Sequence, residues 1–284
     1  MRIDLHTHSA VSDGTDTPTE LVHAAAAAGL DVVAITDHDT TASWAAAARA
    51  ASETNLTLIR GSEISTQLGP RSVHLLGYLF DPDEPLLAAE LDLIRDNRVP
   101  RLQEMTRRLQ EQGVLVTWDD VLEQAGSAES VGRPHLADAL VARGFVASRE
   151  VAFATLLGWQ SPAYVAKYSP DTAAAIRLVR AAGGVPVIAH PWAGGRRGAL
   201  DLAMIASLID AGLAGLEVDH LDHDDRTRAE LRGTADDLGL IVTGSSDYHG
   251  TGKQGYGLGV CTTSPQSYEA LLAAAGPNGV EVVG

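Results

Sequence analysis

The chain has 284 residues, 45% of them apolar, which suffices for one large globular domain or for one domain with a sizeable insertion. Its formal charge of -16 argues against a basic surface that binds long duplex nucleic acid or an anionic membrane. The single cysteine, Cys261, excludes an internal disulfide, and we expect a cytoplasmic protein with no signal peptide and no membrane-spanning segment.

The first part of the chain alternates between strand-like and helix-like segments. Thr17, Pro18 and Glu20 give the first helix a capping residue, a proline in its first turn and an early acidic side chain. Short apolar runs between the helices are typical of buried strands. The predicted strands are 3–5, 31–35, 57–59 and 72–78, and the predicted helices are 17–28 and 41–51.

The alternation stops between about residues 84 and 158, where the pattern is helical throughout. It then resumes with a helix at 171–182, strands at 185–189, 215–218 and 241–243, a helix at 265–275 and a short tail at 280–283. We therefore predict a main domain formed by residues 1–97 and 166–284, with an inserted helical domain at 98–165 that covers it.

Alternating strands and helices imply a parallel sheet, and about seven strands suggest a barrel related to the eight-stranded kind. Active sites in such folds gather at the carboxyl ends of the strands. Histidine and acidic residues fall at these ends: His6, His8, His38, Glu63, His190, Asp247 and His249. In extended chain the imidazoles of His6 and His8 point to the same face, so both can reach one metal ion. His74 fits less well, because it falls early in its strand.

Taken in order, these motifs resemble those of the polymerase-and-histidinol-phosphatase (PHP) superfamily of metal-dependent phosphoesterases. The motifs are His6-Thr7-His8-Ser9, Asp13-Gly14, Thr36-Asp37-His38, Glu63, His74, Ala189-His190-Pro191 and Ser246-Asp247-Tyr248-His249. The insertion, with Gly132-Arg133-Pro134-His135, is similar to the bacterial branch that acts on nucleoside 3',5'-bisphosphates and short RNA 5' ends. The resemblance implies an α/β fold, a distorted (βα)7 TIM-like barrel with a small inserted α-helical domain.

The resemblance also implies a centre of three divalent transition-metal ions, often manganese, iron or zinc. Mixed imidazole and carboxylate ligands suit these metals better than magnesium or calcium. The implied ligands form three groups: His6, His8, Glu63 and Asp247; then Glu63 again, as a bridge, with His74 and His190; and finally Asp13, His38 and His249.

From this centre we expect hydrolysis of a phosphomonoester of a small nucleotide. The scissile group is the 3'-phosphate of a nucleoside 3',5'-bisphosphate, or the 5' end of a short RNA. A metal-bridging hydroxide attacks phosphorus while the metals absorb charge on the phosphate oxygens. His8, Glu63 and Asp247 are the residues we expect to be essential for this step.

A second phosphate of the substrate needs its own cations. Arg133 and His135 flank a proline that suits the first turn of a helix, where free backbone N–H groups also favour anions. We expect this pair to bind the remote phosphate, with Lys167, Arg196 and Arg197 as further contacts. Ordinary surface charge is the alternative interpretation for each of them.

Three further polar residues keep more than one interpretation. Asp37 either orients His38, or takes part in proton transfer, or caps the following turn. His220 either protonates the leaving oxygen or belongs to a solvated charged run at 219–225. For His223 the solvated position is the more plausible of the two.

Three other functions compete with this one. A barrel amidohydrolase also begins with His-x-His, but many use a carbamylated lysine on a strand, and neither Lys167 nor Lys253 falls on a predicted strand. A histidinol-phosphate phosphatase has the same metals and a different substrate. A non-catalytic metal-binding module is the alternative outside enzymes, and the complete set of ligands argues against it.

Overall fold

A computed structural model describes residues 1–193 and 200–284 of the chain. Its seven strands form one sheet in which spatial order follows chain order. A parallel bridge between Thr7 and Tyr248 then joins the segments that follow the first and last strands, so the sheet curls into a nearly closed barrel. The predicted seven-stranded α/β barrel is confirmed. The strands are β1 (Ile3–Asp4), β2 (Val32–Ile35), β3 (Thr57–Leu68), β4 (Arg71–Tyr78), β5 (Val185–Ile188), β6 (Gly215–Asp219) and β7 (Ile241–Gly244).

The expectation of an all-parallel sheet is wrong at one strand. β4 runs antiparallel to both β3 and β5. A two-residue turn joins β3 to β4 as a hairpin, which is too short for the crossover that parallel strands need. The reversal explains His74. Because β4 enters the barrel from the opposite direction, its first half lies at the end where the other strands finish.

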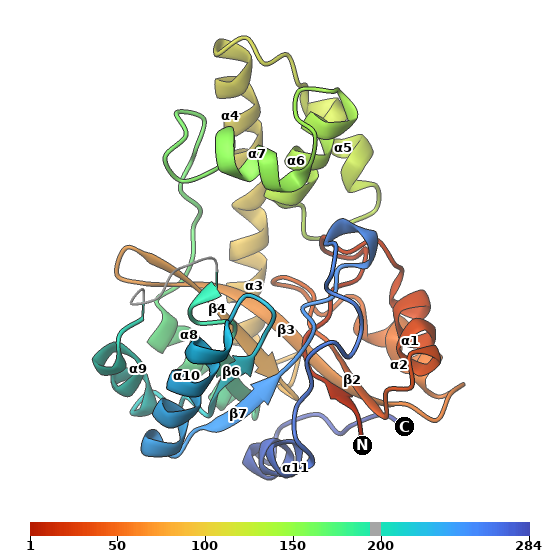
Figure 1. Ribbon diagram of the computed structural model, residues 1–284, viewed down its shortest axis with the longest axis vertical. Coiled ribbons are helices and arrows are strands. Elements are labelled where there is room, and N and C mark those ends of the chain that lie inside the picture. The colour runs from red at the N-terminus through yellow and green to blue at the C-terminus, as the bar shows by residue number, and fades with distance from the viewer. Residues whose placement is uncertain (194–199) are drawn as a thin grey trace.

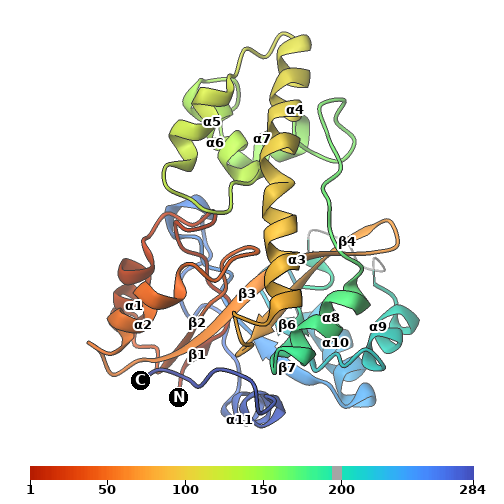
Figure 2. The ribbon, with the colours of Figure 1, turned by 180° about the vertical axis from the view of Figure 1, so that it is seen from behind.

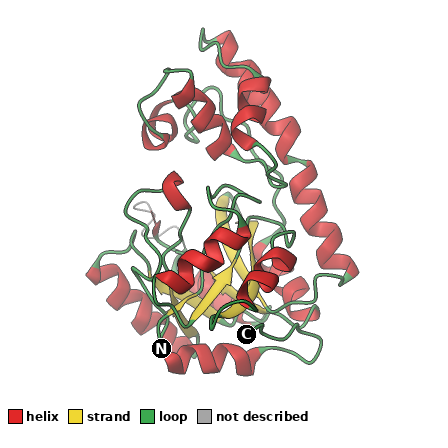
Figure 3. Cartoon of the chain, turned by 90° about the vertical axis from the view of Figure 1, so that its right-hand side faces the viewer, coloured by secondary structure: helices red, strands yellow, loops and turns green. Residues whose placement is uncertain are grey.

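Outside the helical segment at 84–158, six described α-helices cover the sides and the lower end of the barrel (Figure 3). They are α1 (Pro18–Ala27), α2 (Trp44–Ala51), α8 (Thr172–Ala181), α9 (Leu202–Ile209), α10 (Asp225–Leu238) and α11 (Pro265–Ala274). The sequence analysis did not predict α9 and α10. Their signals are the caps Asp201 and Asp224, whose carboxylates accept from the amides of Met204 (2.8 Å) and Thr227 (2.7 Å).

The strands bury both faces, as barrel strands do. In β2, Val33 and Ile35 face the outer helices, whereas Val32 and Ala34 face the barrel interior. The interior cluster also contains side chains of α11, which lies below the barrel (Figure 1). That end is therefore filled with apolar side chains, and the opposite end is left for polar ones.

Five helices follow β4. The first packs against the barrel, where its Leu87, Leu91 and Ile94 join the hydrophobic cluster of the outer helices, and the other four stand above the open end (Figure 1). The five are α3 (Pro85–Asp96), α4 (Arg98–Glu111), α5 (Trp118–Ala125), α6 (Arg133–Ala142) and α7 (Arg149–Thr155). α3 and α4 follow one another almost end to end and carry the chain upward (Figure 2). A separate hydrophobic cluster, from Leu102 to Ala163, holds the upper helices together. None of the helices described in this structure is long and apolar enough to cross a membrane.

Candidate metal centre

All nine predicted ligands lie together at the upper end of the barrel. Three follow β1, one follows β2, one lies on β3, one on β4, one follows β5 and two follow β7. Within the described residues, ligand atoms approach one another closely enough to hold ions in four overlapping groups. The groups are His8, Asp13, His38 and His249; His6, Glu63 and His190; His6, His8 and Asp247; and His38, Glu63 and His74.

Two imidazoles and two carboxylates approach one another at the base of the cluster. His6 Nε2 and His8 Nε2 lie 3.0 Å apart and are 3.2 and 3.1 Å from Glu63 Oε2. Asp247 Oδ1 lies 3.6 and 3.5 Å from the same two nitrogens. Bonds of about 2.0–2.2 Å to a central ion place tetrahedral ligand atoms about 3.3–3.6 Å apart. The distances from each carboxylate to the two nitrogens therefore suit ligands of a transition-metal ion.

Glu63 directs its two carboxylate oxygens to different groups of histidines. Oε2 lies near His6 and His8, whereas Oε1 lies 2.6 Å from His74 Nδ1 and 3.1 Å from His190 Nε2. The reversed direction of β4 is what puts His74 within reach. One carboxylate can thus serve two neighbouring ions.

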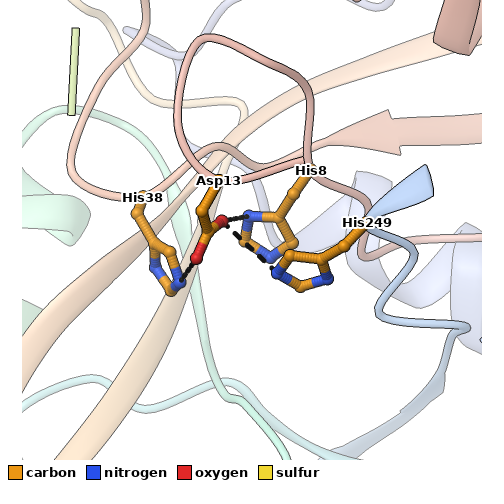
Figure 4. Close-up of side chains that lie close together, drawn as sticks. All are labelled: His8, Asp13, His38 and His249. Atoms are coloured by element: carbon orange, nitrogen blue, oxygen red, sulfur yellow. Dashed lines mark ion pairs between the residues drawn. The ribbon is translucent and has the colours of Figure 1, made fainter. Parts of the chain in front are cut away.

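Asp13 is the centre of a third group, in which three imidazoles surround one carboxylate (Figure 4). Its oxygens lie 3.3 Å from His249 Nε2, 3.6 Å from His38 Nε2 and 3.7 Å from His8 Nδ1. His8 Nδ1 is buried and has no hydrogen-bond partner. A buried nitrogen without a hydrogen-bond partner lowers the stability of the fold. His8 Nδ1 lies on the side of the ring next to Asp13, 3.7 Å from Oδ1, where a metal ion could take the place of the missing partner.

The loop that carries Asp13 is held by Asp37. The Asp37 carboxylate accepts from the Ser9 amide (2.8 Å), the Ser9 hydroxyl (2.7 Å) and the Ser12 hydroxyl (2.6 Å). The loop closes tightly, because a Cβ at Gly14 would lie 2.2 Å from the carbonyl oxygen of His8. Asp37 therefore positions the loop of Asp13 rather than the neighbouring His38.

Glu217 is a buried carboxylate that the sequence analysis missed. It lies on β6 with its Oε1 3.1 Å from His6 Nδ1, and its Oε2 accepts from the backbone N–H of His190 at 2.8 Å. An acceptor at Nδ1 keeps the proton there and leaves Nε2 of His6 free to bind metal. A buried acid in an apolar strand is the signal that could have identified it.

Two ligands stand on strained backbone. His190 and Asp247 have φ angles of 25° and 52°, a region that non-glycine residues rarely occupy. Such strain costs on the order of 1–3 kcal/mol per residue and persists where surrounding contacts enforce it. The hydrogen bond from the His190 amide to Glu217 is one such contact.

The solvated interpretation of His220 and His223 is wrong, because both side chains are buried. His220 accepts at Nδ1 from the Asp222 amide (3.1 Å), so the proton of the neutral ring lies on Nε2, which donates to Asp247 Oδ2 at 3.2 Å. His223 contacts the backbone of Val218 and Trp192. Both rings support the site from below.

Lys253 was considered only as a lysine outside the strands, and the structure places it at the site. Its ammonium contacts Asp247 Oδ2 and lies 3.8 Å from the centre of the Tyr256 ring. Asp247 thus turns Oδ1 to the histidines and Oδ2 to Lys253 and His220. Neither of the two lysines lies on a described strand.

The charges of the cluster are balanced among its own members. Burial alone would raise the pKa of Glu63, but the imidazoles of His38 and His74 hold it well below its usual range. Burial would lower the pKa of His8, and the carboxylates of Asp247 and Glu63 outweigh it and raise the value to about 10. Burial lowers the pKa of His38 to about 3. Metal ligation requires neutral imidazoles, so ions binding here displace protons.

Comparison with known proteins agrees with this geometry. The PHP domain family matches residues 4–96. A 3',5'-nucleoside bisphosphate phosphatase of Chromobacterium violaceum is 36% identical over 90% of this chain and 90% of its own length. A 5'-3' exoribonuclease of Haemophilus influenzae is 35% identical over 87% of this chain and 90% of its own.

The chain belongs to the PHP family. A crystal structure from Bifidobacterium adolescentis, described as a candidate metal-dependent phosphoesterase, superposes with a TM-score of 0.92 at 40% identity over 96% of both chains. The chain is accordingly an enzyme of the metal-dependent phosphoesterase class.

In this PHP protein a pocket of about 360 Å³ lies between the ligands and the helices above them. The barrel side contributes charged and imidazole groups, including Glu63 and Lys253. The helical side contributes Pro134, Arg149 and Phe153. Arg149 holds this side in place, because it pairs with Asp138 at 2.5 Å and donates to the carbonyl oxygen of Gly252 at 3.2 Å.

The predicted phosphate-binding residues lie in different surroundings. Arg133 donates to the Leu157 carbonyl at 3.0 Å and stacks on Phe153, with its guanidinium carbon 5.2 Å from the ring centre. His135 is buried and accepts from the Gly132 amide at 2.9 Å. The predicted contacts Arg196 and Arg197 lie outside the described residues.

Lys167 interacts electrostatically with three arginines of the helical segment. Burial, and then the charge of Arg98, lower its pKa to about 7, with Arg101 and Arg133 contributing further. The charge of Lys167 is also among the causes that lower the pKa of His74, after burial. The Asp39 carboxylate, which pairs with Arg98, acts in the opposite direction and raises the pKa of Lys167.

Proposed function

We propose that the chain hydrolyses a phosphomonoester of a small nucleotide, the 3'-phosphate of a nucleoside 3',5'-bisphosphate or the 5' end of a short RNA. The observation that carries the proposal is the division of the Glu63 carboxylate between two groups of histidines in the wall of the pocket. The named activities of the relatives from C. violaceum and H. influenzae support a nucleotide substrate.

We propose three metal positions, to be filled by manganese, iron or zinc. Bound there, such ions lower the pKa of water and neutralise charge on phosphate oxygens. The residues that would hold them, as the family resemblance implies, are His6, His8, Glu63 and Asp247 for the first, Glu63, His74 and His190 for the second, and Asp13, His38 and His249 for the third. Close contacts within each set support this assignment.

The chain's own residues then orient the substrate. Glu217 and Asp37 fix ligand positions through hydrogen bonds. The Lys253 ammonium, partly exposed in the pocket, offers a cation to a phosphate oxygen while it still holds Asp247 Oδ2. Residues 98–165 would act as a covering domain, held over the pocket by the hydrogen bond from Arg149 to Gly252.

The second phosphate of a bisphosphate would bind at the cations Arg98, Arg101, Arg133 and Lys167. This group is partly buried, and among its described interactions Asp39 is the carboxylate that offsets it. A buried excess of positive charge favours an anion. Arg133 therefore stays within the proposed subsite, while His135 would act by fixing the start of α6.

The experiment is phosphate release with added Mn²⁺ from adenosine 3',5'-bisphosphate, AMP, histidinol phosphate and a short 5'-phosphorylated RNA. Preference for the bisphosphate or the RNA supports the proposal. Preference for histidinol phosphate would overturn the substrate, and no release from any of the four would favour a non-catalytic module.

A variant separates the two phosphate positions. Lys167→Met should raise KM for the bisphosphate on the order of tenfold and leave an aryl monophosphate unchanged, because charged hydrogen bonds to phosphate are strong. Arg107→Gln is the control, since Arg107 is exposed on α4 and pairs with Glu104. Equal effects of Lys167→Met on both substrates would refute the subsite.

A further inference from the structure

The helical side of the pocket carries an aromatic ring that the metal chemistry does not use. Phe153 lies on α7 and lines the pocket across from Glu63 and Asp247. Chemistry on a phosphoryl group needs cations and proton donors, and a phenyl ring supplies neither. Its position opposite the metal ligands calls for a separate explanation.

Phe153 differs from the residues that hold the helices together. The members of the hydrophobic cluster on α4 and α6, such as Leu102 and Leu140, are fully buried. Phe153 packs against that cluster but is only partly buried, and it contributes to the pocket wall together with Pro134. Part of its surface therefore remains exposed in a residue that lines the pocket.

The ring is held firmly. The Arg133 guanidinium lies over it, with 5.2 Å between the guanidinium carbon and the ring centre. The chain also turns sharply behind it, since a Cβ at Gly158 would lie 2.7 Å from the Phe153 carbonyl oxygen. A fixed aromatic ring is a good stacking surface, because little side-chain freedom is lost when a flat ligand covers it.

We propose that Phe153 is the stacking surface for the base of the nucleotide and determines the preference for a nucleotide over a phosphate ester without a base. This inference rests on the proposed function. Every base has a flat π-face, so stacking on one ring gives affinity with little choice among bases. Arg133 then has two contacts to offer, the ring of Phe153 and the second phosphate.

The test compares adenosine 3',5'-bisphosphate with ribose 3,5-bisphosphate, which lacks the base. Phe153→Leu keeps an apolar side chain against the helices and removes the ring. It should raise KM for the adenosine compound on the order of tenfold more than KM for the ribose compound, as loss of an aromatic stacking partner does, because any shift of Arg133 affects both substrates alike. Phe153→Tyr should behave as the wild type.

Phe145→Leu is the matched control, because Phe145 belongs to the same helical segment, is 39% exposed and does not line the pocket. A parallel fall in kcat/KM for both substrates with Phe153→Leu would assign the ring a packing role and overturn the inference. So would an unchanged KM for the adenosine compound.

A binding measurement separates this inference from the proposed function. Stacking quenches the fluorescence of 2-aminopurine riboside 5'-phosphate, and this readout needs no turnover. We expect quenching by the wild type and by Phe145→Leu, with the apparent Kd raised on the order of tenfold by Phe153→Leu. Quenching without phosphate release would leave the base site standing and refute the phosphatase. Equal quenching by Phe153→Leu and the wild type would refute the base site alone.

Discussion

Replacement of Glu217 by glutamine tests how the metal centre is supported. The carboxylate faces donors on both oxygens: His6 Nδ1 and the Ser245 hydroxyl on Oε1, and the His190 amide on Oε2. Glutamine has one carbonyl oxygen and one NH2 group, so the donors on one side lose their acceptor. Glu217 is fully buried, so the lost acceptor is not replaced by bulk solvent.

The expected loss follows from these contacts. Removing a group that orients a metal-binding histidine lowers metal affinity about 10–100-fold, or about 1.4–2.7 kcal/mol. A buried donor left without a partner costs about 1–3 kcal/mol of folding stability. Each kcal/mol lowers the melting temperature by about 2–4 °C in a domain of this size class.

Metal affinity is measured by competition with a chelator, and stability by thermal unfolding with the metal removed. Asp219→Asn is the control, since Asp219 lies on the same strand and pairs with Arg232 at 2.7 Å. Such partly exposed pairs contribute about 0–1 kcal/mol. Wild-type metal affinity in Glu217→Gln would show that Glu217 does not orient His6, and the reasoning would fail.

Three further predictions concern protons, the Asp13 loop and the junction with α4. The carboxylates around His6 and His8 outweigh burial, so the pKa of His8 is raised to about 10 without metal and that of His6 is raised well above its usual value. Both protons must leave before metal binds. Metal affinity should therefore rise at least about tenfold per pH unit between pH 6.5 and 8.5 in chelator competition, and a flat profile contradicts this. Asp37→Ala frees the loop of Asp13 and should lower metal content by about one ion per chain in elemental analysis, whereas a full complement would argue against its positioning role. Asparagine tolerates the φ of 55° at position 39, but Asp39→Asn leaves Arg98 without its carboxylate partner. We expect this variant to lower the free energy of unfolding by about 3–5 kcal/mol in urea unfolding. A loss below about 1 kcal/mol would mean that water already solvates the Arg98 guanidinium.

The barrel and the clustering of its ligands could be predicted because both have local signals. Apolar runs mark the strands, and histidines follow them at fixed offsets, as His6 and His190 do. The direction of β4 could not be predicted in this way. Strand direction depends on pairing partners distant in sequence, and the short turn before Arg71 was hidden because the preceding strand was assigned only to residue 59 instead of Leu68.

The supporting residues were harder to assign than the ligands. Glu217 interrupts an apolar strand, and only the three-dimensional structure shows that His6 lies opposite it. His220 lies in a run of charged residues that suggests solvent exposure, yet its loop folds inward onto Asp247. Hydrogen-bond partners 27 and 211 residues away along the chain leave no periodic pattern in the sequence.

The order of the strands has a consequence for biosynthesis. The predicted ligands begin at His6 and end at His249, and each of the groups that contain His8 needs a side chain from the last strand's end. A nascent chain therefore exposes unpaired histidines and carboxylates until most of the barrel has been synthesised. Complete metal loading is therefore expected late in synthesis. A chain that ended before His249 would lack one ligand of the group formed by Asp13, His38 and His249, even if its first strands had folded.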